Sequence, residues 1–143
     1  MTKGYKAENK LNVIVEDEYG YAAIRGPGSG GGTSRARPDL VAIKADYTKD
    51  YGVYEKIERR DVVVIELKAS SDGTAYLDSH EVEELNEWAN RAGGNAYVIV
   101  KPDLRSHDQW YCFKTNQLNE TENGYSITKD MLPEAFTLDE VFA

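Results

Sequence analysis

Residues 62–69 constrain the fold more than any other part of the chain. They read VVVIELKA, in which four consecutive apolar residues open the segment. Strands with near-continuous apolar runs are typical of sheets covered on both faces. We therefore expect an α/β structure, with this strand inside a mixed sheet and helices packed on the two faces. A chain of 143 residues with 41% apolar side chains is long enough for one such domain over residues 1–143.

Two amphipathic helices are expected to supply those layers, one over residues 5–18 and one over residues 79–92. In both segments apolar side chains recur at spacings of three, four and seven, which is the period of one helical face. Gly20 follows the first segment and Gly93-Gly94 follows the second, so both are predicted to end at glycine. The residues assigned to the inward faces are Leu11, Ile14, Val15 and Glu18 in the first helix and Val82, Leu85, Trp88 and Ala89 in the second.

The remaining segments divide into further strands and connections. Short apolar stretches predict strands over residues 21–25, 40–44, 97–101 and 109–113, with residues 124–127 as a last edge strand. Five glycines in residues 26–34 exclude helix and strand and predict a mobile loop. Residues 45–60 are polar and tyrosine-rich, which suits either a hairpin extension or a long loop. Residues 114–143 form a C-terminal extension whose path the pattern does not determine.

Composition limits the location of the chain and its metal chemistry. No apolar run is long enough to span a bilayer and the first residues lack the pattern of a signal peptide, so we expect a cytoplasmic protein that does not bind membranes. The single cysteine, Cys112, excludes an internal disulfide and a multi-cysteine zinc site. With only His80 and His107 as imidazole ligands, a bound divalent metal would need oxygen ligands.

Charge is unevenly distributed along the chain. The total is −8, but residues 1–60 carry +2 and residues 61–143 carry −10. The global charge opposes nucleic-acid binding, whereas the local pattern is compatible with a basic face on an acidic body. Scattered surface charge is the simpler alternative. The early basic residues are Lys3, Lys6, Lys10, Arg25, Arg35, Arg37 and Lys44.

Three acidic residues and one lysine are candidates for chemistry. Glu66 and Lys68 are two apart on a predicted strand and so project from the same face, where a carboxylate can hold a metal and an ammonium can position water. Asp39 opens another strand, and hard oxygen ligands brought together at such a point suit Mg²⁺ or Mn²⁺. Glu8 lies on the inward helical face with Leu11. Each candidate also has a simpler interpretation. Glu66 and Lys68 can form an ordinary salt bridge on one face, Asp39 can be a common turn residue, and Glu8 can be a solvated glutamate.

Six short segments, in order, resemble the archaeal Holliday junction resolvases of the Hjc type, which belong to the PD-(D/E)xK nuclease superfamily. The resemblance runs from about Gly4 to Phe113, and residues 110–113 (WYCF) resemble the aromatic strand of that family. It implies a restriction-endonuclease-like fold, in which a mixed central sheet is flanked by helices. The six segments are KGYKAE at 3–8, RGPGSG at 25–30, PDL at 38–40, IELK at 65–68, YL at 76–77 and GG at 93–94.

The resemblance also implies roles for individual residues. Glu8, Asp39 and Glu66 match the metal-binding acids of the family, and Lys68 matches its catalytic lysine. Arg25 and Ser29 match loop residues needed for cleavage, and Trp88 falls where the family has an aromatic residue at the contact between two subunits. The implied protein is a homodimer that uses Mg²⁺, or Mn²⁺ as a substitute, to cut a four-way DNA junction. The residues expected to contact DNA are Lys6, Lys10, Arg25, Arg35 and Arg37.

Two parts of the sequence depart from the family pattern or add to it. Asn9 stands where many members have arginine after the first glutamate, and residues 45–60 look longer than in compact members. Residues 137–142 resemble the end of a peptide that binds a sliding clamp, through Leu138, Val141 and Phe142. A terminal amphipathic turn packed on its own domain explains those three residues equally well.

The favoured function is a metal-dependent endonuclease that resolves four-way junctions. The nearest rival is a nuclease of the same superfamily that acts on nicked, flapped or duplex DNA with the same catalytic residues. A non-catalytic DNA-binding or clamp-associated adaptor and an acidic interaction domain are the remaining alternatives.

Overall fold

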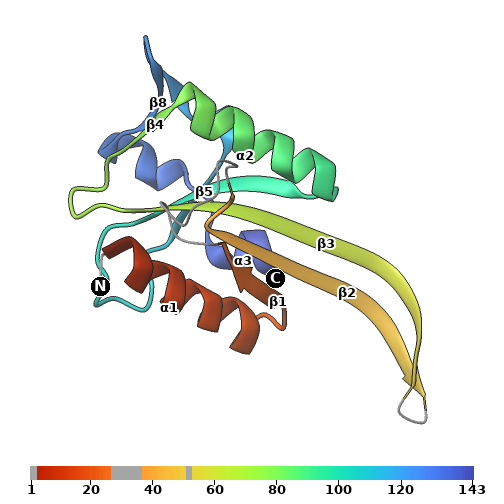
Figure 1. Ribbon diagram of the computed structural model, residues 1–143. Coiled ribbons are helices and arrows are strands. Elements are labelled where there is room, and N and C mark those ends of the chain that lie inside the picture. Colours follow the sequence, from red (N-terminus) through yellow and green to blue (C-terminus); the bar gives the residue numbers. More distant parts are fainter. Residues whose placement is uncertain (1–2, 27–36, 51–52) are drawn as a thin grey trace.

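A five-stranded mixed sheet lies between two helices (Figure 1). The structure, a computed structural model, describes residues 3–26, 37–50 and 53–143. The predicted loop at 26–34 therefore falls almost entirely outside the described residues. The strand order is β1-β2-β3-β5-β6, and only β3 and β5 pair in parallel among these neighbours. The strands are β1 (Ala22–Arg25), β2 (Leu40–Asp50), β3 (Val53–Ala69), β5 (Asn95–Lys101) and β6 (Tyr111–Lys114).

The strand β3 is central and covered on both faces, as its apolar run predicts. Val63, Ile65 and Leu67 belong to the buried cluster under α1 (Lys3–Asp17). Val62 and Val64 belong to the cluster under α2 (Ser79–Ala92), on the opposite face. The expected fold class, a mixed central sheet flanked by helices, is thus confirmed.

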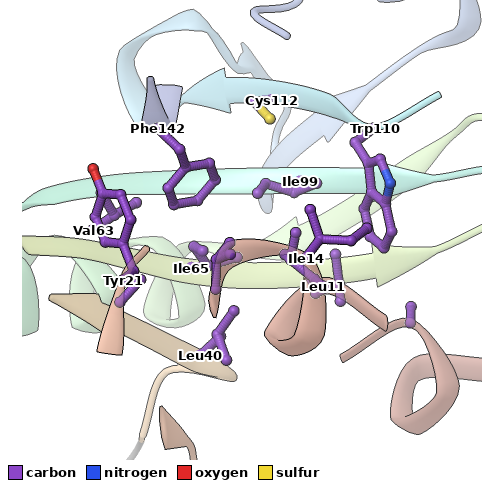
Figure 2. Close-up of a cluster of buried hydrophobic side chains, with 14 residues drawn as sticks. Leu11, Ile14, Tyr21, Leu40, Val63, Ile65, Ile99, Trp110, Cys112 and Phe142 are labelled. Carbon is purple, nitrogen blue, oxygen red and sulfur yellow. The ribbon is translucent and has the colours of Figure 1, made fainter. Parts of the chain in front are cut away.

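The helix α1 buries Ala7, Leu11, Ile14 and Val15 against the sheet, so its inward face is largely as predicted (Figure 2). The assignment of Glu18 to that face is wrong. Glu18 follows the end of the helix at Asp17 and is exposed, and its carboxylate lies 3.1 Å from Nε2 of His107 at the surface.

The helix α2 has the predicted bounds because capping signals mark both its first and its last turn. Asp78 accepts a hydrogen bond from the backbone N–H of Glu81 at 2.8 Å, and the Glu81 side chain accepts one from the N–H of Asp78. This reciprocal pair is a capping box. At the other end Gly93 has φ 72°, a left-handed conformation in which glycine carries no steric penalty.

A second, three-stranded sheet was not predicted. It has the order β4-β8-β7, with β4 at Ala75–Asp78, β7 at Asn119–Glu120 and β8 at Gly124–Ile127. The expectation that residues 124–127 form an edge strand of the main sheet is therefore wrong. β8 pairs with β4 instead, and four- and two-residue strands are too short to show a periodic pattern in the sequence.

Residues 45–50 and 53–60 extend the β2–β3 hairpin, so the hairpin is the correct alternative of the two predicted for this segment. The two strands pair from Leu40 opposite Ile65 to Asp50 opposite Val53, and two irregularities in register interrupt the ladder. In Figure 1 this hairpin projects well beyond α1 and β1. The strand predicted at 109–113 instead begins at Tyr111, since Gln109 has φ 65°, a conformation that interrupts extended backbone.

The C-terminal segment completes the core under α1. It forms short helices at Thr115–Gln117, Lys129–Glu134 and, as α3, Leu138–Phe142. The Phe142 side chain is 2% exposed, and its ring meets that of Tyr21 edge-on with centroids 5.3 Å apart (Figure 2). Leu138 and Val141 pack against the same cluster. Within the described residues, no helix is both long and apolar enough to cross a membrane.

Candidate active site

Asp39 and Glu66 meet where β2 begins and β3 ends. The backbone N–H of Asp39 donates to the carbonyl of Ile65 at 3.0 Å, and the N–H of Leu67 donates to Asp39 Oδ2 at 2.8 Å. These two bonds fix the Asp39 carboxylate beside β3. The Glu66 side chain lies within hydrogen-bonding reach of it, so the protonated form of Glu66 donates to Asp39.

The two carboxyl groups disfavour each other's ionisation. Burial, together with the charge of Asp39, raises the pKa of Glu66 to about 8. Burial also raises the pKa of Asp39, although the N–H of Leu67 acts in the opposite direction. Two partly buried carboxylates side by side are electrostatically unfavourable until a proton or a cation neutralises one of them. The site is therefore suited to a cation.

Lys68 lies on the same face of β3 as Glu66, as the period of two predicts. Its Nζ is 3.7 Å from Glu66 Oε1 and 2.9 Å from Glu81 Oε2. Burial by itself would lower the pKa of Lys68, but the hydrogen bond to Glu81 and the charge of Glu66 outweigh it and raise that pKa. The lysine is thus a cation beside the carboxylate pair.

The nearest charged partner of Glu8 is Arg25. One of its carboxylate oxygens lies 3.8 Å from an Arg25 guanidinium nitrogen, and that guanidinium stacks 4.1 Å above the Tyr5 ring. Burial raises the pKa of Glu8, and the charge of Asp39 adds to the effect. Glu8 therefore lies within electrostatic range of Asp39, but its nearest charged partner is Arg25 and its side chain is 18% exposed.

The donor set fits a hard divalent cation through two protein carboxylates. In residues 3–26, 37–50 and 53–143, no three His, Cys, Asp or Glu side chains are grouped closely enough to hold one ion. Mg²⁺ usually keeps several waters and binds through one or two carboxylates plus substrate phosphates. The Asp39–Glu66 pair matches that pattern, while the predicted three-acid set with Glu8 is not assembled.

The other predicted residues differ in their exposure and contacts where the structure describes them. Lys6 and Arg37 are exposed, and Lys10 Nζ donates to the carbonyl of Leu104. Ser29 and Arg35 lie outside the described residues. Trp88 is half-buried on α2, where it packs against the core on that side of the sheet.

Sequence reasoning missed Glu81, which is not among the residues predicted for the inward face of the second helix. Its carboxylate reaches Lys68 and lies close enough to Asp39 and Glu66 to contribute to the raised pKa of both. The available signal was the spacing Asp78-x-x-Glu81, which marks a capping box and so places Glu81 in the first turn of α2.

A carboxylate pair and a lysine at the end of a helix-flanked mixed sheet fit the chemistry of a metal-dependent nuclease. The family model described as archaeal Holliday junction resolvase (Hjc) matches residues 1–143. The chain belongs to this family.

Individual relatives are similar over nearly the whole chain. The crossover junction endodeoxyribonuclease Hjc of Archaeoglobus fulgidus is 30% identical over 140 residues, which cover 98% of this chain and 89% of that protein. The protein of the same name from Sulfurisphaera tokodaii is 28% identical over 143 residues, covering 98% and 85%. The 1.6 Å structure of A. fulgidus Hjc, a Holliday junction resolvase, superposes with a TM-score of 0.76 over 98% of this chain and 100% of that one.

Proposed function

We propose that this chain is an endodeoxyribonuclease that resolves four-way DNA junctions by hydrolysing phosphodiester bonds at Asp39, Glu66 and Lys68. The single observation that supports the assignment of the site is the position of Lys68 beside the Asp39–Glu66 pair: its Nζ is 3.7 Å from Glu66 Oε1. Membership of the Hjc family, whose relatives are named crossover junction endodeoxyribonucleases, supports the reaction and the substrate.

Each residue has a defined task in this proposal. When bound, Mg²⁺, or Mn²⁺ in its place, would supply positive charge at the scissile phosphate and would lower the pKa of the attacking water. Asp39 and Glu66 hold that cation, since they are the paired carboxylates of the site. Lys68 orients the water or stabilises the charge that develops on the phosphate. Glu8 and Arg25 border the site, and Ser29 completes the catalytic set.

DNA binding is assigned to basic residues in the first 37 positions of the chain. Lys6, Lys10, Arg25, Arg35 and Arg37 are proposed to contact backbone phosphates, which would give binding that weakens steeply with salt. The acidic remainder of the chain would keep DNA away from other faces. We expect the protein to act in the cytoplasm, where its substrate would be found.

Paired cuts require two active sites at a fixed separation, which a two-fold homodimer supplies. Trp88 is the proposed anchor of the interface because it is a half-buried aromatic residue on α2. Trp88→Ala should shift the protein toward monomer in sedimentation at micromolar concentration. A wild-type protein that sediments as a monomer under those conditions would contradict the dimer.

A sliding-clamp contact through Leu138, Val141 and Phe142 would need a change of conformation. Phe142 is 2% exposed in the core under α1, so it would have to leave that core before it could enter a pocket of another protein. We propose that these residues serve the fold, and that clamp binding, if measured, requires the segment to detach.

The test of the function combines cleavage and binding at one stated salt concentration. Asp39→Asn and Glu66→Gln should bind a four-way junction at least as tightly as wild type in EDTA, because neither adds negative charge near phosphate, yet should give no nicked product with Mg²⁺. Lys68→Ala should lose cleavage and some affinity. Glu84→Gln, an exposed acid on α2, is the matched control.

The outcome that contradicts the assignment is cleavage at the wild-type rate by Asp39→Asn. Loss of junction binding in that variant would instead indicate that Asp39 maintains the fold. Flapped, nicked and linear duplexes of the same sequence should be compared with the junction, since preference for one of them would favour a related nuclease.

A further inference from the structure

Glu81 connects the start of α2 to the lysine of the active site. Its two carboxylate oxygens have different partners: Oε1 accepts from the backbone N–H of Asp78 at 3.4 Å, and Oε2 accepts from Lys68 Nζ at 2.9 Å. The helix cap and the catalytic strand are therefore joined through one side chain.

The competition for Lys68 is uneven. Its Nζ is 2.9 Å from Glu81 but 3.7 Å from Glu66, so the shorter, hydrogen-bonded contact is with the helix rather than with the carboxylate assigned to the metal. A lysine side chain is a flexible stem that carries a compact charge, and it adopts one position only when a partner holds it there.

We infer that Glu81 is a positioning residue for the nuclease reaction: it holds the Lys68 ammonium beside the Asp39–Glu66 pair and keeps it from closing onto Glu66. This inference rests on the proposed function. Without Glu81, the nearest remaining anion to Lys68 is Glu66. The ammonium would then neutralise a carboxylate that the cation needs, and it would leave the place from which it acts on water or phosphate.

Rigidity at the start of α2 makes Glu81 suitable for this task. The N–H of Glu81 is bonded to Asp78 Oδ1 at 2.8 Å, so the residue is held at its backbone as well as at its side chain. The Glu81 side chain is 36% exposed, so its removal leaves the buried cores intact.

The experiment separates positioning of Lys68 from capping of α2. Single-turnover cleavage of a four-way junction at saturating enzyme and Mg²⁺ is compared with junction affinity in EDTA, for wild type and four variants. Glu81→Ala removes both contacts. Glu81→Gln keeps an oxygen that can accept from Lys68. Asp78→Ala removes the stronger capping bond but leaves the Lys68–Glu81 contact. Glu84→Ala controls for the loss of one acidic charge from the same helix.

We expect Glu81→Ala to cleave about tenfold or more slowly, the scale of loss that follows when a reacting group is misplaced. Its junction affinity should be unchanged or higher, because a negative charge has been removed. Glu81→Gln should recover much of the rate, while Asp78→Ala and Glu84→Ala should cleave nearly as wild type.

Three results would overturn the inference. These are a wild-type rate in Glu81→Ala, equal losses of rate in Glu81→Ala and Asp78→Ala, or parallel losses of rate and affinity in Glu81→Ala. Failure of the wild-type protein to cut the junction would instead contradict the proposed function, so the two failures are distinguishable.

Discussion

The raised pKa of Glu66 predicts that the metal-free protein becomes less stable as the pH rises from about 5 to about 8. In the folded protein this pKa is about 8, against 4.5 for the same group in its ordinary setting. Between these values the folded form keeps a proton that the unfolded form has released. Raising the pH therefore lowers the free energy of unfolding. The stabilisation from the proton on Glu66 is fully present below the unfolded pKa and is lost as the pH rises to the folded pKa.

The magnitude follows from the number of protons involved. One group contributes at most about 1.4 kcal/mol per pH unit, hence at most about 2.7 kcal/mol between pH 5.5 and 7.5. The Glu66 side chain is 21% exposed, and solvent around it weakens the effect. We expect a loss of about 1–2 kcal/mol across this interval, which corresponds to a fall in Tm of several degrees.

Urea unfolding in EDTA at pH 5.5 and 7.5, followed by circular dichroism, measures this loss. Glu66→Gln should flatten the pH dependence because the amide does not titrate, whereas Glu84→Gln should retain it. Mg²⁺ should stabilise the wild type more at pH 7.5 than at pH 5.5, because the cation competes with the proton for the carboxylates.

Equal pH dependence in the wild type and in Glu66→Gln would refute this reasoning, since other groups would then carry the effect. Stabilisation by Mg²⁺ that is the same in both proteins would show that the cation binds elsewhere.

Three further predictions concern packing. Phe142→Ala should cost about 3–5 kcal/mol in urea unfolding because it empties a buried ring site, while Val13→Ala, at a position 55% exposed, should cost well under about 1 kcal/mol. Gly26→Ala should cost about 1–3 kcal/mol and slow cleavage, because an added Cβ would lie 2.0 Å from the carbonyl oxygen of Pro38 and displace the backbone next to Asp39. Burial raises the pKa of the Cys112 thiol to about 12, so a disulfide reagent should label it only at the rate of unfolding, and rapid labelling without urea would contradict its burial.

The parts of the fold that could be predicted are those whose signals are local. The apolar run of residues 62–65 predicted a strand covered on both faces, and Gly93 marked the end of α2. The β4–β8 pairing was not predictable, because each strand has four residues and the two are far apart in the sequence. Likewise nothing near Phe142 indicates that its ring will meet Tyr21.

The candidate site divides in the same way. The common face of Glu66 and Lys68 follows from the alternation of a strand, so it could be derived from two residues. Asp39 was identified as a candidate from its position in the chain relative to Glu66 and Lys68 and from the family resemblance. Its hydrogen bond from Leu67 could not be derived, because that bond depends on the pairing of β2 with β3. Glu81 was missed because its contact with Lys68 depends on where α2 packs, although its capping spacing was visible.

The backbone bridge between Cys112 and Phe136 has a consequence for solubility. β6 is an outer strand of the main sheet, and outer strands offer unpaired amides and carbonyls to other chains. The N–H of Cys112 donates to the carbonyl of Phe136 at 3.0 Å, and the reverse bond is 2.8 Å. The segment that carries Phe136 thus blocks the middle of this edge. If the backbone is cleaved between residues 114 and 136, the segment that carries Phe136 is no longer held beside β6 by the intact chain. We then expect intermolecular strand pairing and aggregation to begin at β6.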